Sequence, residues 1–525
     1  MSELVSANNL NLEQAATCGM VIAVHANAFP DRAAIYSDQG NRTFGELNAK
    51  VNQLARVFKE AGLKPGDGAA LICSNRPEFA ESILAAARTG VRLTPVNWHL
   101  SAKEITHIVN DCEARVVIGD VRLKDNLEYM IENCPNVEVP LAVGGEIKGF
   151  SSYDDAINAQ DSSDLTDPVI GSQMLYTSGT TGHPKGVWKE PSSVRPASIA
   201  QMLTYTGGED TDLCTGPLYH AAPLGISLLQ PLNSGVGVYF MDKWDAEETL
   251  RIIQEYKITH THMVPTMFHR MLALPEDVRS KYDVSSMKYV VHGAAPCPVH
   301  VKKEFMDWFG RIMFEYYGGT EGGGGCFIEP EEWFKKPGSV GKPSMDGTII
   351  LSDDDKILPP GEIGRVYMIS PDGGHFKYFK APEKTTDAYF GDNDSHFTLG
   401  DLGYLDEEGY LYLSDRRSDM ILSGGVNVYP AEIDACLLLH PAVGDACTIG
   451  IANPNWGQEV ISVIEPKDGI ETSDALAAEL IQHCIDNIAK FKCPRQIKFM
   501  DELPRSDAGK IKRRVVRDIY DPESK

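Results

Sequence analysis

The segment with the clearest chemical content is YTSGTTGHPKGV, residues 176–187. Its small residues let backbone N–H groups approach a phosphate closely, its hydroxyl groups can donate hydrogen bonds to phosphate oxygens, and its lysine adds a point charge. The segment does not match the Walker A pattern GxxxxGK[ST]. It predicts a different phosphate-binding loop, and the alternative is a polar surface turn. The predicted ATP contacts are Thr177, Ser178, Gly179, Thr180, Thr181, Gly182 and Lys185.

The string TSGTTGHPKG resembles the signature loop of the adenylate-forming superfamily. This superfamily includes acyl-CoA synthetases, aryl-CoA ligases, the adenylation domains of peptide synthetases and firefly luciferases. Further segments resemble the motifs of this family in the family's order, and together they cover most of the chain. This resemblance implies roles for the residues of each of these segments.

Two segments resemble the adenine side of the family's nucleotide site. VVHGAAP (290–296) resembles a strand and turn whose small residues admit a flat base, and EYYGGTEGG (315–323) resembles the YGxTE motif. Tyr317 matches the aromatic residue that stacks on adenine, and Glu321 matches the Mg²⁺ ligand, an oxygen donor of the kind that this hard cation prefers. The further nucleotide-binding residues of these segments are Gly293, Ala294, Ala295, Gly318 and Thr320.

The stretch 399–421 resembles the family's ribose-binding motif, which leads into the interdomain hinge. Asp401 matches the carboxylate that accepts both ribose hydroxyls, and an ionised acceptor suits two neighbouring O–H donors. Arg416 matches the arginine that reaches ribose or phosphate oxygens. Ser418 departs from the family, because many relatives carry Asp or Lys there, and this leaves the bias of the hinge open.

Two later segments resemble the family's C-terminal motifs. SGGVNVYPAEID (423–434) resembles the glycine-rich segment along which the pantetheine arm of CoA passes, with Gly424 and Gly425 allowing close approach. LPRSDAGKIKRR (503–514) resembles the terminal lysine motif. Lys510 matches the lysine that stabilises charge at the α-phosphate, and it joins Glu321 and Thr177 as the predicted catalytic groups.

The acyl site is the least determined part of the resemblance. PLYHAAP (217–223) resembles a family segment in which His220 lies beside the acyl group, although a buried structural histidine is an equal alternative. Small residues near this site favour an extended or bulky apolar acid. The sequence of residues 396–430 most resembles that of bacterial fatty-acyl and steroid-side-chain CoA ligases. Aryl acids stay open, and acetate is disfavoured. The expected substrate contacts are His220, His292, Gly318 and Gly319.

The implied function is that of an ATP-dependent acyl-CoA ligase with Mg²⁺ and CoA. The acid attacks the α-phosphate of ATP to form acyl-AMP and pyrophosphate, and the CoA thiol then displaces AMP. The chain ends 15 residues after Lys510, which favours a free acceptor such as CoA. The alternatives are an acyl-AMP ligase that loads a separate carrier protein, an aryl-CoA ligase, a luciferase-like oxygenase and a non-catalytic nucleotide-binding regulator.

The elements that must position these residues indicate a multidomain α/β chain. Residues 11–63 read as helical, and short apolar runs then alternate with helical stretches, which favours parallel α/β architecture. From about 340 to 415 the pattern becomes that of short antiparallel strands, and from 430 onward that of a compact α+β unit. We therefore expect an N-terminal adenylation domain, 1–416, and a small mobile C-terminal domain, 417–525, that acts as a lid.

Composition sets outer limits on the function. The chain has 525 residues and a net charge of −25, which argues against wrapping nucleic acid, so phosphate contacts must be concentrated in few places. The 11 cysteines are odd in number and form no CxxC pair, which favours reduced thiols in a cytoplasm. The N-terminal segment lacks the features of a signal peptide. The sequence contains no run of 18 apolar residues, so no membrane span is expected. A homodimer is left open.

Overall fold

The computed structural model describes residues 10–177, 184–190, 203–295, 297–322, 325–370, 376–416, 419–423, 426–453, 457–488, 490, 492–507 and 509–521.

The first sheet of the N-terminal region is parallel, with the strand order β7-β6-β5-β3-β4-β8. Its central strand, GAALI, is buried along its whole length, as expected for a parallel strand covered on both faces. The strands are β3 (Gly68–Ile72), β4 (Arg92–Pro95), β5 (Ala114–Asp120), β6 (Val139–Val143), β7 (Ser151–Ser152) and β8 (Ser172–Gln173).

The second sheet has the order β17-β16-β15-β14-β13-β11-β12-β1-β2 and is parallel from β15 to β1. The carboxyl ends of its parallel strands lead into 215–220, 293–295 and 318–322, which carry predicted site residues. Its strands are β1 (Ala33–Tyr36), β2 (Arg42–Thr43), β11 (Thr211–Cys214), β12 (Gly237–Phe240), β13 (His260–Met263), β14 (Tyr289–His292), β15 (Met313–Tyr317), β16 (Cys326–Ile328) and β17 (Lys342–Pro343).

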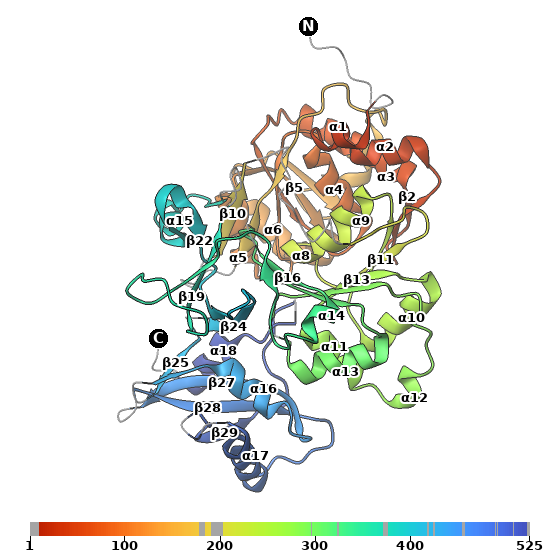
Figure 1. Cartoon of the computed structure of the whole chain (residues 1–525). Coiled ribbons are helices and arrows are strands. Elements are labelled where there is room, and N and C mark those ends of the chain that lie inside the picture. The colour runs from red at the N-terminus through yellow and green to blue at the C-terminus, as the bar shows by residue number, and fades with distance from the viewer. Residues whose placement is uncertain are drawn as a thin grey trace.

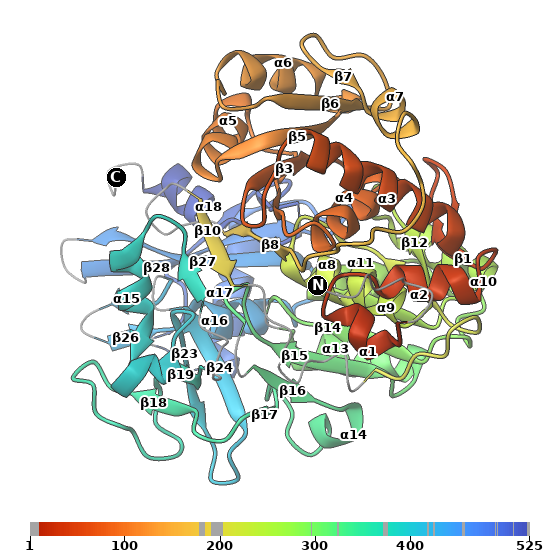
Figure 2. The ribbon, with the colours of Figure 1, turned by 90° about the horizontal axis from the view of Figure 1, so that it is seen from above.

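Helices surround these two sheets, and they appear in red to green in Figures 1 and 2. They are α1 (Leu12–Ala16), α2 (Val21–Ala28), α3 (Phe44–Glu60), α4 (Pro77–Ala87), α5 (Ala102–Asp111), α6 (Lys124–Glu132), α7 (Tyr153–Asn158), α8 (Ala221–Leu224), α9 (Gln230–Asn233), α10 (Ala246–Tyr256), α11 (Pro265–Leu272), α12 (Glu276–Arg279), α13 (Val299–Phe309) and α14 (Pro330–Trp333). A π-helical turn, Gly225–Leu229, joins α8 to α9.

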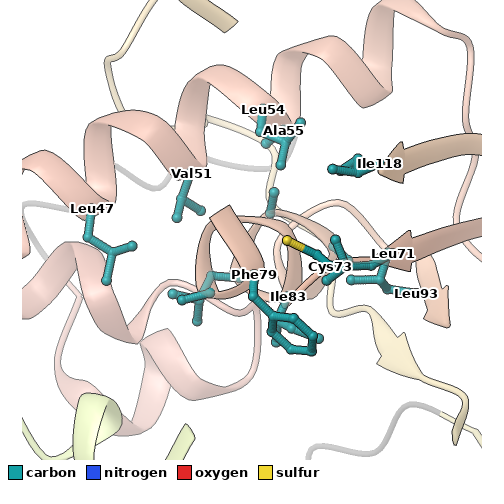
Figure 3. Packing of buried hydrophobic residues seen from close by; sticks show 14 of the residues in the cluster. Leu47, Val51, Leu54, Ala55, Leu71, Cys73, Phe79, Ile83, Leu93 and Ile118 are labelled. Carbon is teal, nitrogen blue, oxygen red and sulfur yellow. The ribbon is translucent and has the colours of Figure 1, made fainter. Parts of the chain in front are cut away.

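The longest N-terminal helix, α3, shows how the core is built. Its residues Leu47, Val51 and Leu54 recur at spacings of four and three, so they share one helix face and are fully buried. Figure 3 shows this face turned toward Phe79 and Ile83 of α4. The helix begins with a capping box between Thr43 and Glu46, which satisfies N–H groups that its first turn leaves without intrahelical partners.

Two smaller sheets continue the N-terminal region. One is antiparallel, with the path β21-β22-β19-β23-β24 and with β18 paired to β19; the other has the order β20-β10-β9. Their elements are β9 (Leu175–Thr177), β10 (Lys185–Lys189), β18 (Ile349–Leu351), β19 (Gly364–Ile369), β20 (Phe376–Tyr378), α15 (Pro382–Ala388), β21 (Tyr389–Phe390), β22 (His396–Phe397), β23 (Asp401–Leu405) and β24 (Leu411–Arg416).

The C-terminal unit, blue in Figure 1, has its own sheet, with the order β26-β25-β28-β27 and with β29 paired to β28. Helices α16 and α17 pack on this sheet around a separate cluster of buried residues that includes Ile433, Leu437 and Leu480, whereas Val516 of α18 belongs to a second cluster. The elements are β25 (Ile421–Ser423), β26 (Val426–Val428), α16 (Pro430–Leu437), β27 (Val443–Asn453), β28 (Gly457–Pro466), α17 (Asp474–Asn487), β29 (Gln496–Phe499) and α18 (Arg513–Tyr520).

The predicted fold class is confirmed, with one local correction. The segment 11–63 is not helical throughout, because β1 and β2 lie between α2 and α3. Strand β1 pairs with β12, more than 200 residues away in the chain, and local periodicity carries no information about such a partner. All 11 cysteines are free and most are buried, as predicted. None of the described helices is long and apolar enough to cross a membrane.

Candidate active site

One large cavity of about 2410 Å³ is lined by residues of both parallel sheets, the antiparallel sheet and the C-terminal unit. Small-molecule pockets usually measure roughly 300–1,000 Å³, so this cavity can hold more than one substrate at a time. Many of the residues predicted from the sequence line it. They are Thr177, Lys185, His220, Ala294, Ala295, Tyr317, Gly318, Gly319, Thr320, Glu321, Asp401 and Lys510.

The ends of the predicted phosphate loop are held by a β-hairpin. Thr177 at the end of β9 lies opposite Lys185 at the start of β10, so both ends of the loop are fixed at the cavity wall. The Lys185 ammonium lies 4.9 Å from the centre of the Tyr378 ring. Burial and the neighbouring charge of Lys384 lower the pKa of Lys185.

The same tyrosine also contacts the predicted metal ligand. The Tyr378 hydroxyl donates a 2.8 Å hydrogen bond to Oε1 of Glu321. Lys189, on β10, lies close to this carboxylate, and its pKa is lowered by burial although the charge of Glu321 opposes the shift. Tyr378 and Lys189 were not predicted from the sequence. The alternation of β10, which puts Lys185 and Lys189 on one face of the strand, was the available signal for Lys189.

The carboxylate set fits Mg²⁺ bound mainly through a nucleotide. Across the described part of the chain, no group of three or more His, Cys, Asp and Glu side chains could hold a metal. Mg²⁺ is usually held by one or two carboxylates together with substrate phosphates and water, and not by an all-protein cage. A single carboxylate, that of Glu321, is therefore sufficient. It lies at the wall of a cavity that also contains Lys185.

The turn after β14 approaches the cavity through an unusual backbone. Ala294 has φ +67°, in the left-handed region that side chains other than glycine rarely adopt. A Cβ on Gly293 would lie 2.5 Å from a ring carbon of Tyr316, so the glycine is required for the packing of that ring. Ala294 and Ala295 line the cavity, whereas the space beside Gly293 is filled by Tyr316.

The predicted adenine and ribose residues are joined directly. Tyr317 ends β15 and its hydroxyl donates a 2.7 Å hydrogen bond to Oδ2 of Asp401, the first residue of β23. Both residues are buried yet line the cavity. In the antiparallel register Asp401 lies opposite Arg416, which brings these two predicted positions together at the backbone level.

Two neutral histidines lie where Lys510 enters the cavity. The pKa of His220 and that of His262 are each lowered to about 4, mainly by burial and further by the charge of Lys510. Nε2 of His220 is buried with no hydrogen-bond partner among the described residues. Both imidazoles are therefore uncharged near pH 7 and offer polar atoms without a charge. His262 was not predicted.

His292 is a correction to the predicted substrate contacts. It is fully buried and is not among the described residues that line the cavity. Its Nε2 lies 3.6 Å from Glu315, which forms a buried 2.7 Å ion pair with Lys302. Burial and the charge of Lys302 hold the pKa of His292 well below its usual value. Since β14 turns this side chain into the core behind the wall, His292 is not retained as a substrate contact.

Lys510 is presented by a tight hairpin. Ser506 N–H donates to the Lys510 carbonyl at 2.7 Å, and Gly509 N–H donates to the Ser506 carbonyl at 2.8 Å. Gly509 has φ +75°, and a Cβ there would lie 2.7 Å from the Thr266 hydroxyl of α11. The glycine therefore serves both the turn and its close approach to the N-terminal region.

Several predicted residues lie outside the described residues, and their roles stay predictions. This holds for Ser178, Gly179, Thr180, Thr181 and Gly182 of the phosphate loop, for Ser418, for Gly424 and Gly425, and for the side chain of Arg416.

Comparison with known proteins agrees with this geometry. The sequence profile of the AMP-binding enzyme family matches residues 22–376, which is more than half of the chain, and that of the AMP-binding enzyme C-terminal domain matches residues 432–510. The chain belongs to the AMP-binding enzyme family. The second match ends at Lys510, so the two matched regions contain Lys185, Tyr317, Glu321 and Lys510, whereas Asp401 lies in the stretch between them.

Three of the similar proteins are named as CoA ligases. The chain is 29% identical to an indoleacetate–CoA ligase of Aromatoleum aromaticum, over 94% of this chain and 96% of that protein. It is 30% identical to the long-chain-fatty-acid–CoA ligase FadD13 of Mycobacterium tuberculosis, over 91% and 93% of the two chains. Among solved structures, an anthranilate CoA ligase in complex with anthranoyl-AMP matches with a TM-score of 0.86 at 25% identity, covering 99% of this chain and 100% of the other. The predicted membership of the adenylate-forming superfamily is confirmed.

Proposed function

We propose that the chain is an ATP-dependent ligase that joins a carboxylic acid to CoA through an acyl-AMP intermediate. The observation that carries the proposal is the meeting, in one cavity, of three features: the Tyr317–Asp401 pair, the Glu321 carboxylate and Lys510 from the C-terminal unit. A protein that only bound a nucleotide would not need Lys510 in this cavity. The names of the relatives, which include CoA ligases for indoleacetate and for long-chain fatty acids, support the same reaction class.

In the first half-reaction an oxygen of the acid attacks the α-phosphorus of ATP. The bond from this phosphorus to the bridging oxygen breaks, and pyrophosphate leaves with the electron pair. Catalysis of this kind consists mainly of positioning and charge stabilisation. Tyr317 and Asp401 would hold the nucleoside, and Lys185 and Lys510 would face the phosphates. Mg²⁺ held at Glu321 would supply charge neutralisation on the phosphate oxygens.

In the second half-reaction the sulfur of CoA attacks the acyl carbon. The carbon–oxygen bond to AMP breaks, the thiol loses its proton, and AMP is released. We propose that the C-terminal unit, residues 417–525, turns away from the adenylation arrangement between the two steps, so that Lys510 leaves and the segment containing Gly424 and Gly425 approaches. Such a motion is a lid-type conformational step.

We propose a hydrophobic acid as the substrate, of the fatty, steroid-side-chain or aryl type. The cavity is lined near His220 by the apolar residues Ala222, Ile226, Leu229, Val264 and Met267. Burial keeps the two neighbouring histidines uncharged, so they do not provide a counter-charge for a second carboxylate. The free, mostly buried cysteines support a cytoplasmic location, where thiols stay reduced.

The test is a panel of carboxylic acids with ATP and Mg²⁺, read by pyrophosphate release and by mass spectrometry of the acyl product, with and without CoA. We expect an acyl-CoA product with at least one hydrophobic acid. Sustained turnover only with an added carrier protein would instead identify a carrier-loading ligase, and oxygen-dependent light emission would identify a luciferase-like oxygenase. ATP binding without any acid-dependent pyrophosphate exchange would contradict the proposal.

A further inference from the structure

Asp507 lies three residues before Lys510, and its carboxylate is held by hydrogen bonds from the N-terminal region. Oδ2 of Asp507 accepts a 2.6 Å hydrogen bond from Nδ2 of Asn97 and a 2.9 Å hydrogen bond from the hydroxyl of Tyr219. Nδ1 of His99 lies 3.8 Å from Oδ1. The Asp507 side chain is 19% exposed, so these contacts cover most of it.

The N-terminal groups are themselves fixed. Oδ1 of Asn97 accepts the backbone N–H of His99 at 2.8 Å, which orients the Asn97 amide so that its NH₂ group faces Asp507. Tyr219 is only 4% exposed, and burial and the Asp507 carboxylate raise the pKa of its phenol, so it stays a hydrogen-bond donor at neutral pH. Asn97 follows strand β4 of the first sheet, whereas Tyr219 lies in the segment between β11 and α8 of the second.

We propose that Asp507 is a positioning residue that latches the lysine hairpin to the N-terminal region in the adenylation arrangement. The proposal rests on the proposed function of Lys510. The hairpin is closed by hydrogen bonds between Ser506 and Lys510. Contacts that fix the position of Asp507 therefore also fix the position of Lys510. Hydrogen bonds to a charged acceptor are among the stronger ones, and both donors come from outside the C-terminal unit.

The latch is specific to one arrangement of the chain. When the C-terminal unit turns for thioester formation, the contacts of Asp507 with Asn97 and Tyr219 must break, because these residues belong to the N-terminal region. A contact present in only one of two states shifts the population toward that state. Loss of the latch should therefore slow adenylation and leave thioester formation unchanged or faster.

The first experiment compares the two half-reactions in Asp507→Ala and Tyr219→Phe. ATP–pyrophosphate exchange reports adenylation, and thioester formation from a supplied acyl-adenylate reports the second step. We expect exchange to fall about ten- to a hundredfold in Asp507→Ala, the range for loss of hydrogen bonds to a charged group, and less in Tyr219→Phe. Asp501→Ala, at an exposed carboxylate of the same unit, and Tyr129→Phe, at an exposed tyrosine, are the matched controls. Equal loss in both steps would overturn the proposal.

The second experiment asks whether Asp507 acts through Lys510. In a Lys510→Ala background, Asp507→Ala should cause no further loss of exchange, because the group that the latch positions is already absent. An undiminished further loss would show that Asp507 acts by another route and would overturn the proposal.

The third experiment needs no activity. Hydrogen exchange of the 505–512 amides should become faster in Tyr219→Phe than in the wild-type chain, although the substitution lies in the N-terminal region. Unchanged exchange would overturn the latch. If the wild-type chain formed no acyl-adenylate with any acid, the proposed function would fail, while this measurement would still decide whether the latch exists.

Discussion

The hydroxyl of Tyr317 donates a 2.7 Å hydrogen bond to the carboxylate of Asp401, across 84 residues of sequence and between two sheets. The bond fixes the Tyr317 ring beside the carboxylate. The residue proposed to stack on adenine and the residue proposed to hold ribose are therefore positioned as a unit.

Asp401→Asn should weaken ATP binding. The substitution keeps the shape of the side chain but removes the charge from an acceptor that would face two ribose hydroxyls. Hydrogen bonds to charged groups contribute about 1.5–3 kcal/mol, so we expect the Kd for ATP to rise at least about tenfold. Isothermal titration with ATP measures this change. Tyr404→Phe, on the same strand but outside the cavity lining, is the control, and an unchanged Kd in Asp401→Asn would contradict the assignment.

Lys510→Ala should separate the half-reactions. Removal of one preorganised donor to a developing charge typically costs about 10²–10³ in rate, and we expect that loss in ATP–pyrophosphate exchange. Thioester formation from a supplied acyl-adenylate should persist, because its reacting carbon does not require the lysine. Lys498→Ala, an exposed lysine on β29 of the same unit, should leave both rates unchanged. Parallel loss of both steps in Lys510→Ala would refute its proposed role.

Glu321→Gln should change the metal requirement. The carboxylate that accepts the Tyr378 hydroxyl would lose its charge, and Mg²⁺ bound through ATP would lose an anionic ligand. We expect the Mg²⁺ concentration for half-maximal pyrophosphate release to rise about tenfold, in the range seen when metal-site interactions are removed. Chelation by EDTA should abolish release in the wild-type chain. Glu362→Gln, an exposed carboxylate outside the cavity, is the control, and an identical Mg²⁺ titration in Glu321→Gln would contradict the role.

Asp212 on β11 should make stability depend on pH. It is fully buried and accepts the Tyr205 hydroxyl at 2.8 Å, and burial raises its pKa to about 7. Between about pH 4 and pH 7 the folded chain keeps a proton that the unfolded chain has lost, so this group's contribution to stability falls as the pH rises through that window. Asp212→Asn removes this dependence.

Thermal unfolding of both chains at pH 5 and pH 8 measures the effect. At about 1.4 kcal/mol per pKa unit, the variant should gain about 2–3 kcal/mol relative to wild type between these pH values. The gain would appear as a rise of several degrees in the Tm difference. The exposed carboxylate Asp468 provides the control variant Asp468→Asn. A Tm difference that does not change with pH would show that Asp212 is ionised in the folded chain throughout.

The parts of the site that the sequence predicted are those carried by short, contiguous motifs. Thr177, Lys185, Tyr317, Glu321, Asp401 and Lys510 each lie in a string whose order of small, hydroxyl and charged residues is restrictive, and the structure brings them to one cavity. The parallel sheets were predicted for a similar reason, since buried strands such as Ala114–Asp120 are apolar runs that can be read locally.

The parts that were missed depend on partners far apart in the sequence. Nothing near Tyr378 indicates that its hydroxyl meets Glu321, 57 residues away, and nothing near Asp507 points to Asn97, 410 residues away. His292 was predicted to contact the substrate, but its side chain is buried in the core. The sequence of a strand does not say which of its two faces borders a ligand. These relationships follow from the packing of the sheets against one another.

The segment 416–421 separates two groups of site residues along the sequence. Tyr317 and Asp401 lie before it and Lys510 lies after it. Substitutions near Tyr317 and Asp401 can alter the affinity for a nucleotide, and substitutions in the C-terminal unit or at its contacts Asn97 and Tyr219 can alter how often the cavity is completed. Nucleotide affinity and the timing of the reaction can therefore change separately in descendants of this sequence, without a new fold.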